Sequence, residues 1–217
     1  MEFIYLTNAL CSFSFLHKPR RRINHKMNNN ETLQIKAVIF DMDGVLLDSE
    51  SVCDKTFLQA AKEQNIQDTK PIIDDARGMG KNSFIDFISK IYGNSVDAEK
   101  LWNRASELFH EIEETKGLSL LPYAKEILEY LKPNYKIALA TSTKRASAQR
   151  QMENAGVFNF FDVTIFGDEV SSTKPSPVIY QTACQKLNLL PENCLAIEDS
   201  YNGIKSAYDA GIKVIMV

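Results

Sequence analysis

The sequence predicts an α/β fold, with a Rossmann-like parallel sheet core and an inserted helical cap domain. Three observations predict this fold. Short apolar, β-branched runs alternate with helical patterns, as in a parallel sheet built from βαβ units. Polar residues closely follow each of the first four runs, where open parallel sheets bind their ligands. About 95 residues separate the first run from the second, far more than one crossover helix requires.

The elements of the core are delimited by local signals. Ser176 before Pro177 is expected to begin one helix, Ser200 is expected to cap another, and Gly156 and Gly211 follow helical stretches as stops. A further helix is expected at 124–131. The expected strands are 37–40, 137–140, 163–166, 195–197 and 214–217.

The long segment between the first two strands is expected to be helical. Phe84, Phe87, Ile88 and Ile91 recur at helical spacing, which is typical of the core of a small helical domain. The expected helices of this insert are 53–65, 83–92 and 97–116. We therefore expect a basic leader at 1–30, a core made of 31–52 and 120–217, and a cap at 53–119.

Charge is distributed unevenly along the 217 residues. The formal net charge is −3, but residues 1–30 hold five Lys or Arg and one Glu, so the rest of the chain is acidic. An acidic body argues against nucleic-acid binding. The apolar run of the leader precedes its basic residues and is too short and too polar to span a bilayer, so no membrane partner is expected. Two interpretations of this leader stay open: a disordered or over-extended start, with Met27 as the first native residue, or a targeting role.

The cysteines and histidines do not form a metal-binding pattern. The four cysteines, Cys11, Cys53, Cys184 and Cys194, lack C-x-x-C spacing, and a zinc site cannot readily be assembled with the three histidines present. Free thiols are typical of a reducing cytosol, so we expect a cytoplasmic protein. His110 lies in a helical stretch and is expected at the surface.

Charged or hydroxyl side chains follow four of the expected strands. In an open parallel sheet these positions meet at one edge, so a single site is the simplest explanation. The residues, strand by strand, are Asp41 and Asp43; Thr141, Ser142 and Thr143; Asp168 and Lys174; and Glu198 and Asp199.

The density of carboxylates at this edge requires a cation. Asp41, Asp43, Glu198 and Asp199 would repel one another unless a hard divalent ion held them together. Mg²⁺ fits best, because it prefers a few carboxylates together with waters and phosphate oxygens. A metal beside one lysine and several hydroxyl donors indicates phosphoryl transfer.

These motifs resemble the haloacid dehalogenase superfamily. The resemblance rests on four motifs: DMDGVLLDSE, the TST after the second strand, the lysine of KPSP, and IEDSYNGIKSAYDAG. More narrowly, the chain is similar to the branch of beta-phosphoglucomutase-like phosphatases with a helical cap, and the similarity runs from Lys36 to Val217. Four motifs in order at matching strand ends make it specific.

The resemblance implies a role for each matching residue. Asp41 would be the nucleophile that becomes an aspartyl phosphate, and Asp43 the acid and base that serves the leaving alcohol and then water. Thr141 and the backbone of Ser142 would bind phosphoryl oxygens. Lys174 would neutralise negative charge on both the nucleophile and the transferring phosphoryl group. Pro175 disfavours a helical conformation at Lys174, which predicts an extended loop.

The same resemblance implies the metal ligands. Glu198 and Asp199, with Asp41 and the Asp43 carbonyl, would hold Mg²⁺. Two other acidic residues, Asp48 and Asp168, are expected to be helix or turn caps. For Glu50, contact with the cap and a place in a first helical turn are both open, and we count it among the candidate substrate-binding residues.

Two positions argue for a phosphatase over a mutase. Sugar phosphomutases of this branch resemble these phosphatases but carry a histidine where Cys53 stands and a phosphate-gripping arginine where Lys81 stands; Arg77 lies four residues earlier. Without a bidentate arginine an intermediate is harder to retain. We therefore expect hydrolysis of a small phosphorylated metabolite by a monomer, with Ser142, Arg77 and Lys81 as further substrate contacts. The alternatives are a beta-phosphoglucomutase, a dehalogenase, which would lack an aspartate like Asp43, and a catalytically silent binding module.

Overall fold

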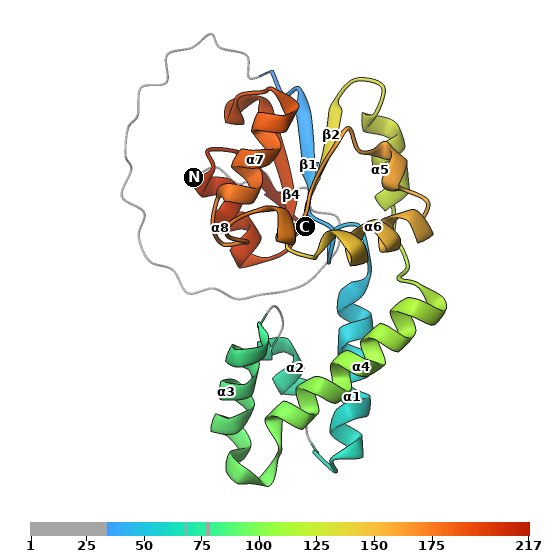
Figure 1. The fold of residues 1–217 in the computed structure, drawn as a ribbon, viewed down its shortest axis with the longest axis vertical. Helices are drawn as coiled ribbons and strands as arrows, with labels where there is room; N and C mark the ends of the chain where they lie inside the picture. Colours follow the sequence, from blue (N-terminus) through green and yellow to red (C-terminus); the bar gives the residue numbers. More distant parts are fainter. Residues whose placement is uncertain (1–33, 68, 77–78) are drawn as a thin grey trace, which may run out of the picture.

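The core of the protein is a parallel five-stranded sheet. The computed structural model describes residues 34–67, 69–76 and 79–217 (Figure 1). The strand order is β3-β2-β1-β4-β5, so the first strand is central and the chain crosses over on both sides of it. The strands are β1 (Ala37–Phe40), β2 (Lys136–Ala140), β3 (Val163–Ile165), β4 (Cys194–Glu198) and β5 (Lys213–Met216).

Helices cover both faces of the sheet, and β1 shows why. All four β1 residues are buried; Ala37 and Ile39 pack with α7 and α8, whereas Val38 and Phe40 pack with α5 and α6. Because successive side chains point to opposite faces, a strand covered on both sides must be apolar throughout. These four helices, on either side of the sheet in Figure 1, are α5 (Ala124–Leu131), α6 (Arg145–Asn154), α7 (Val178–Leu187) and α8 (Tyr201–Asp209).

The predicted core elements are confirmed with small shifts. All five strands are present, and their ends differ from the prediction by at most one residue. Ser200 caps α8 by accepting a hydrogen bond from the Gly203 N–H, and Gly156 and Gly211 adopt the positive φ of helix stops. The expected cap at Ser176 is wrong: Pro177 is the N-cap residue of α7 and provides no side-chain hydrogen bond.

Four helices between β1 and β2 form a second lobe, residues 49–116, which we call the cap lobe. It lies beyond the carboxyl ends of the strands (Figure 1) and has its own apolar cluster, with Phe84 packed between Phe57 and Trp102. The helices are α1 (Ser49–Glu63), α2 (Lys70–Ala76), α3 (Lys81–Tyr92) and α4 (Ala98–Lys116), and the 3₁₀ turns of the chain are η1 (Gly93–Ser95), η2 (Phe158–Phe160), η3 (Gly167–Glu169) and η4 (Pro191–Asn193).

Two expectations for the cap lobe are corrected. The first helix was expected to begin at residue 53, but α1 begins at Ser49, because the Asp48 carboxylate accepts from the Ser51 N–H and caps it there. The short helix α2 was not predicted, since seven residues with Pro71 in the first turn carry too little periodicity to be recognised.

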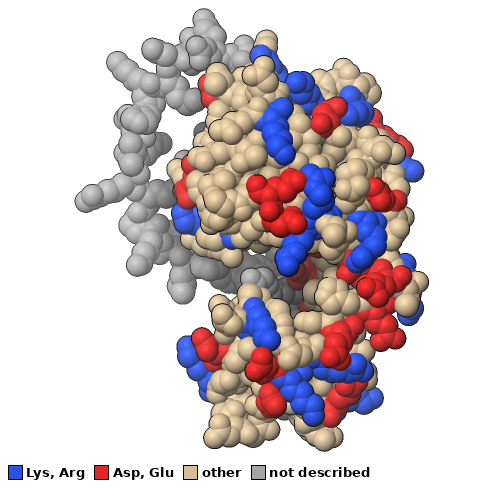
Figure 2. Space-filling view, viewed as in Figure 1, with Lys and Arg blue, Asp and Glu red and all other residues tan. Residues whose placement is uncertain are grey.

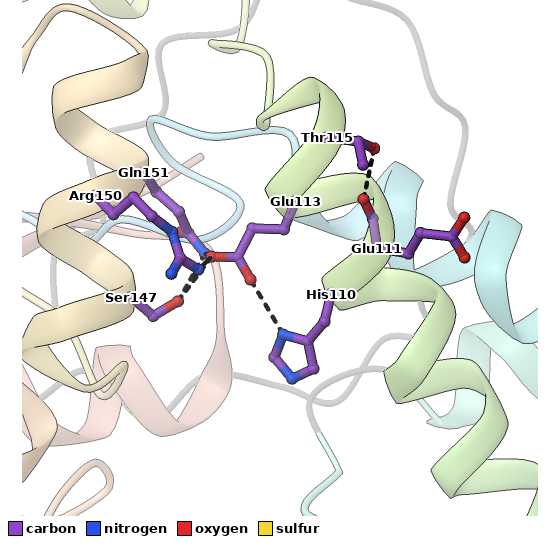
Figure 3. Close-up of polar contacts among 7 residues, drawn as sticks. All are labelled: His110, Glu111, Glu113, Thr115, Ser147, Arg150 and Gln151. Atoms are coloured by element: carbon purple, nitrogen blue, oxygen red, sulfur yellow. Dashed lines mark hydrogen bonds and ion pairs between the residues drawn. The ribbon is translucent and has the colours of Figure 1, made fainter.

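A buried carboxylate, Glu113 of α4, connects the cap lobe to the core (Figure 3). Its Oε1 accepts hydrogen bonds from three α6 side chains: Ser147 Oγ at 2.9 Å, Arg150 Nη2 at 2.5 Å and Gln151 Nε2 at 2.9 Å. Its Oε2 lies 3.1 Å from Nδ1 of His110, which is exposed as predicted. Burial opposes ionisation of Glu113, but these hydrogen bonds outweigh it and lower its pKa to about 2.

The surface carries charges of both signs. Figure 2 shows basic and acidic side chains interspersed over both lobes on the face that it draws. No helix in the described part of the chain combines the length and apolar character needed to cross a membrane. The predicted leader, residues 1–30, lies outside the described residues.

Glu113 should make stability depend on pH. Its pKa in the folded protein lies below the ordinary carboxyl value, so its contribution is full above about pH 5 and is lost as pH falls toward 2. The substitution Glu113→Gln should lower the free energy of unfolding by about 3 kcal/mol at pH 7. The difference from wild type should shrink at pH 3, as measured by urea unfolding followed through Trp102, the single tryptophan.

The matched control is Glu63→Gln, because Glu63 makes an exposed ion pair with Arg104 inside the cap lobe, 2.7 Å away. This control should change stability little at any pH. A difference between Glu113→Gln and wild type that stays constant from pH 7 to pH 3 would contradict the prediction.

Candidate active site

The sheet brings the loops after its strands to one edge. β1 lies between β2 and β4, and Phe40 pairs in register with Leu139 and Ile197. Asp41 therefore leaves the sheet beside the last residues of both neighbouring strands, and its N–H donates to the Ile197 carbonyl at 3.1 Å. The parallel register thus places Asp41 next to Glu198, far away in the sequence.

Lys174 lies between two carboxylates from different strands. Its Nζ is 2.7 Å from Asp41 Oδ1 and 2.6 Å from Glu198 Oε1, and the lysine side chain is only 6% exposed. Burial lowers the pKa of Lys174, but the charges and hydrogen bonds of Asp41 and Glu198 outweigh it, so the net shift is upward. The ammonium therefore stays charged at neutral pH.

The conformation around Lys174 differs from the extended loop expected. The residue is non-helical, as predicted, but it lies in a turn before α7, and the Lys174–Pro175 peptide bond is cis. The turn directs the side chain back under the sheet edge, where it meets Asp41.

The remaining carboxyl groups of this edge resist ionisation. Burial and the nearby Asp41 raise the pKa of Glu198 to about 7, although Lys174 and Tyr180 counteract this. Burial and Asp41 also raise the pKa of Asp199, to about 6, and they raise the pKa of Asp43. The cause is the same in each case: several acidic groups share a desolvated site that holds a single lysine among the described contacts.

Three of these groups could hold a metal ion. Asp41, Glu198 and Asp199 each offer an oxygen, and the three atoms lie within 4.8 Å of one another. The Glu198 Oε2 atom is fully buried and has no hydrogen-bond partner among the residues that the structure describes, so it is available as a ligand. Oxygen ligands of this kind fit Mg²⁺ among other hard cations. The side chain of Asp43 does not belong to this group.

Two glycines permit the carboxylates to come so close. A Cβ atom on Gly44 would lie 1.9 Å from Asp199 Oδ2, and one on Gly203 would lie 1.9 Å from Glu198 Oε2. Gly44 also has a φ of +71°, which other residues rarely adopt. Neither glycine was among the predicted site residues, although Gly44 lies in DMDGVLLDSE and Gly203 in IEDSYNGIKSAYDAG.

Asp43 is held by hydroxyl groups instead. Thr143 Oγ1 donates to Asp43 Oδ2 at 2.9 Å, and Ser49 also hydrogen-bonds to this carboxyl group. These bonds lower the pKa of Asp43, but burial and Asp41 have the larger opposite effect. Thr143 was predicted to lie at this edge, but no role was predicted for it. Ser49 was not among the predicted site residues.

The other polar residues after the strands divide into two kinds. Thr141 is buried beside the site, and its Oγ1 accepts from the Thr143 N–H at 3.1 Å, whereas Ser142 is exposed. Asp168 is a cap, as expected: its Oδ1 accepts from the N–H of Arg145, the first residue of α6, at 2.9 Å.

The structure does not bring the candidate residue Lys81 together with this cluster. Lys81 Nζ is bound inside the cap lobe, 3.0 Å from Glu99 and 3.2 Å from Asn103. Arg77 lies outside the described residues. Glu50 is in the first turn of α1, and its charge contributes to the raised pKa of Asp199, so it lies near the acidic cluster.

Tyr180 contacts Glu198, and the sequence did not predict this contact. It is fully buried in α7, and its hydroxyl donates to Glu198 Oε1 at 2.5 Å, beside Lys174. A tyrosine inside an apolar helical run reads as a core residue, so the sequence carries no signal for this contact.

Comparisons with known proteins identify the family of the chain. A family model of haloacid dehalogenase-like hydrolases matches residues 35–211, so the chain belongs to that family. A "Phosphorylated carbohydrates phosphatase" of Thermotoga maritima is 32% identical over 83% of this chain and 84% of its own length. The "6-phosphogluconate phosphatase" of Escherichia coli is 28% identical over 83% of this chain and 81% of its own length. The crystal structure of a "putative beta-phosphoglucomutase" from Thermotoga maritima is 31% identical, covers 83% of this chain and 84% of its own, and has a TM-score of 0.68.

Family and site together define the class. The protein is an enzyme of the phosphoric monoester hydrolase type, on the parallel α/β fold of the haloacid dehalogenase-like hydrolases and in their beta-phosphoglucomutase-like branch.

Tyr180 should tune metal binding through Glu198. Removing only the hydroxyl, in Tyr180→Phe, leaves the buried Glu198 carboxylate less firmly held, so Mg²⁺ affinity measured by calorimetric titration should fall about tenfold. The control is Thr182→Val, which removes a hydroxyl of the same helix that donates to the Val178 carbonyl and lies outside the acidic cluster. Equal affinities for Tyr180→Phe and wild type would show that the tyrosine only packs.

Proposed function

We propose that the protein is a Mg²⁺-dependent phosphatase that hydrolyses a small phosphorylated metabolite through an aspartyl-phosphate intermediate. One observation carries the proposal: the buried Lys174 ammonium lies within 2.7 Å of both Asp41 and Glu198, at the edge where Asp43 and Asp199 also lie. This arrangement pairs a carboxylate nucleophile with a cation and with a metal-binding set of oxygens.

The metal would be held by Asp41, Glu198 and Asp199, with the Asp43 carbonyl proposed as a fourth ligand. Bound Mg²⁺ would offset the negative charge of these groups and of the phosphate. Burial and, second, repulsion by Asp41 raise the pKa values of Glu198 and Asp199, and a divalent cation would favour their ionised forms against both effects.

In the first step a carboxylate oxygen of Asp41 attacks phosphorus. The bond between phosphorus and the alcohol oxygen breaks, and Asp43 gives its proton to that oxygen as the alcohol leaves. The raised pKa of Asp43 supports its role as the acid, since the group must carry a proton at the start. Lys174 lowers the cost of bringing an anionic phosphate to an anionic nucleophile.

In the second step water releases phosphate from Asp41. Asp43, now ionised, takes a proton from the water, whose oxygen attacks phosphorus and breaks the bond to the Asp41 carboxyl group. The enzyme returns to its starting state with Asp43 protonated. Thr141 and the Ser142 backbone are proposed to bind phosphoryl oxygens in both steps, and the position of Thr141 beside Asp43, through Thr143, supports this role.

The substrate would be recognised by the cap. We propose residues 53–119 as a substrate-covering cap and residues 31–52 and 120–217 as the catalytic core, a boundary that falls inside α1. Glu50, Arg77 and Lys81 remain the proposed substrate contacts; the Lys81 role requires its ion pair with Glu99 to break. A sugar phosphate is the proposed substrate class, supported by the printed names of the two phosphatase relatives.

A beta-phosphoglucomutase is the second candidate, because one similar crystal structure bears that name. The residues argue for hydrolysis: the exposed Cys53 stands where those mutases carry histidine, and Lys81 is engaged by Glu99 and Asn103. We also propose that the enzyme works as a monomer in the cytoplasm; the free thiols of Cys53, Cys184 and Cys194 support the compartment.

Phosphate release should depend on Mg²⁺. With a panel of sugar phosphates that includes beta-glucose 1-phosphate, the enzyme should release inorganic phosphate in the presence of Mg²⁺ and almost none with EDTA. Glucose 6-phosphate is assayed in parallel, because its formation without net phosphate release would establish a mutase instead.

The substitution Asp41→Asn should lower turnover at least about 1000-fold, because the amide is a poor nucleophile, while the melting temperature changes little. The matched control is Asp48→Asn: asparagine caps a helix as well as aspartate does, so this variant should keep wild-type activity. Retained activity in Asp41→Asn would overturn the mechanism.

A further inference from the structure

We propose that Glu113 is a positioning residue that fixes the orientation of the cap lobe over the active site, and that it thereby controls turnover of substrates with a large body more than turnover of small ones. This inference rests on the proposed phosphatase function. It concerns a residue of the cap lobe whose side-chain hydrogen bonds, within the described part of the chain, go to His110 and to α6 and not to the acidic cluster.

Glu113 attaches the cap lobe to the core through hydrogen bonds to α6, and we call this attachment the joint. The carboxylate is 1% exposed, and its Oε1 atom accepts hydrogen bonds from Ser147, Arg150 and Gln151, all on the core helix α6 (Figure 3). Three donors on two successive turns of one helix restrain both the distance and the rotation of α4 relative to α6. Charge-assisted hydrogen bonds are short and strong, so the geometry is well defined.

α4 belongs to both lobes at once. Near its C-terminal end, Phe109 packs against the apolar cluster of the core, whereas Leu101 and Trp102, near its start, belong to the cluster of the cap lobe. Glu113 lies twelve residues beyond Leu101, or about 18 Å along the helix. A rotation of 10° at Glu113 would therefore move the far end of α4 by about 3 Å.

The helix that Glu113 holds also begins at the candidate phosphate-binding loop. Thr141, Ser142 and Thr143 directly precede α6, and Thr143 Oγ1 donates to Asp43 at 2.9 Å. One rigid element thus connects the joint to the proposed acid. Any freedom at the joint would change the position of the cap relative to the reacting phosphate, not only the stability of the cap.

Substrate size separates a positioning role from a structural one. A small acyl phosphate such as acetyl phosphate would be held almost entirely by the core, whereas the body of a sugar phosphate would also have to meet the cap. A displacement of an ångström or more costs catalysis heavily when it affects groups that orient the substrate. A merely destabilising substitution would instead lower the rates of both substrates by the same factor.

The first experiment compares Glu113→Gln with Glu63→Gln, which alters an exposed glutamate that pairs with Arg104 inside the cap lobe. For Glu113→Gln, kcat/KM should fall about tenfold or more for the best sugar phosphate of the panel and less than about threefold for acetyl phosphate. Glu63→Gln should leave both near wild type. Equal losses for the two substrates, or no loss, would overturn the proposal.

A second pair of variants keeps the test valid if Glu113→Gln fails to fold. Arg150→Met removes one donor to Glu113 but keeps the aliphatic stem, and Arg104→Met removes an arginine of similar exposure that pairs only within the cap lobe. Arg150→Met should show the same selectivity with a smaller loss, about threefold for the sugar phosphate. Unchanged Trp102 fluorescence would show that the cap lobe remains folded in each variant.

Solution scattering tests the joint without catalysis. The radius of gyration of Glu113→Gln should exceed that of wild type and of Glu63→Gln, because the two lobes would sample wider orientations. Identical radii in all three would overturn the proposal. If wild-type enzyme releases phosphate from no ester, the proposed function fails, and scattering alone decides whether Glu113 is the joint.

Discussion

The structure depends on one electrostatic constraint: four acidic groups converge at the carboxyl edge of the sheet around a single buried lysine. Without Lys174 within 2.7 Å of Asp41 and Glu198, the free energy of burying these carboxylates would oppose the fold. Even with the lysine in place, burial and, second, repulsion by Asp41 keep the pKa values of Glu198 and Asp199 raised. The same repulsion between carboxylates favours binding of a cation at this edge. The positive charge of a bound metal would in turn attract a phosphate.

Several features beside the acidic groups serve this constraint. Gly44 and Gly203 leave room for carboxylates that any Cβ atom would displace, and Tyr180 supplies a hydrogen bond to a carboxylate that would otherwise have only the lysine. The two-sided burial of β1 makes the edge rigid, because its side chains are locked into clusters on both faces. Site and core are therefore stabilised by the same packing.

The cap lobe is stabilised and attached in a different way. Its helices form an apolar cluster of their own, and a buried, hydrogen-bonded carboxylate attaches the lobe to α6. Such a polar joint has strict geometric requirements, whereas an apolar contact tolerates sliding. A site assembled on the core and a cap oriented by Glu113 allow the chemistry and the choice of substrate to depend on different residues.

The sequence by itself determined the fold class, the five strands and the acidic edge, because a covered parallel strand must be apolar and the residues after it meet at one edge. It could not locate the start of α1, the helix α2, or the role of Tyr180, since these depend on a cap hydrogen bond, a very short helix and a contact between distant segments. The joint at Glu113 is of the same kind. In the sequence it is one glutamate among several in a polar helix; only the packing of α4 against α6 buries it and supplies its donors.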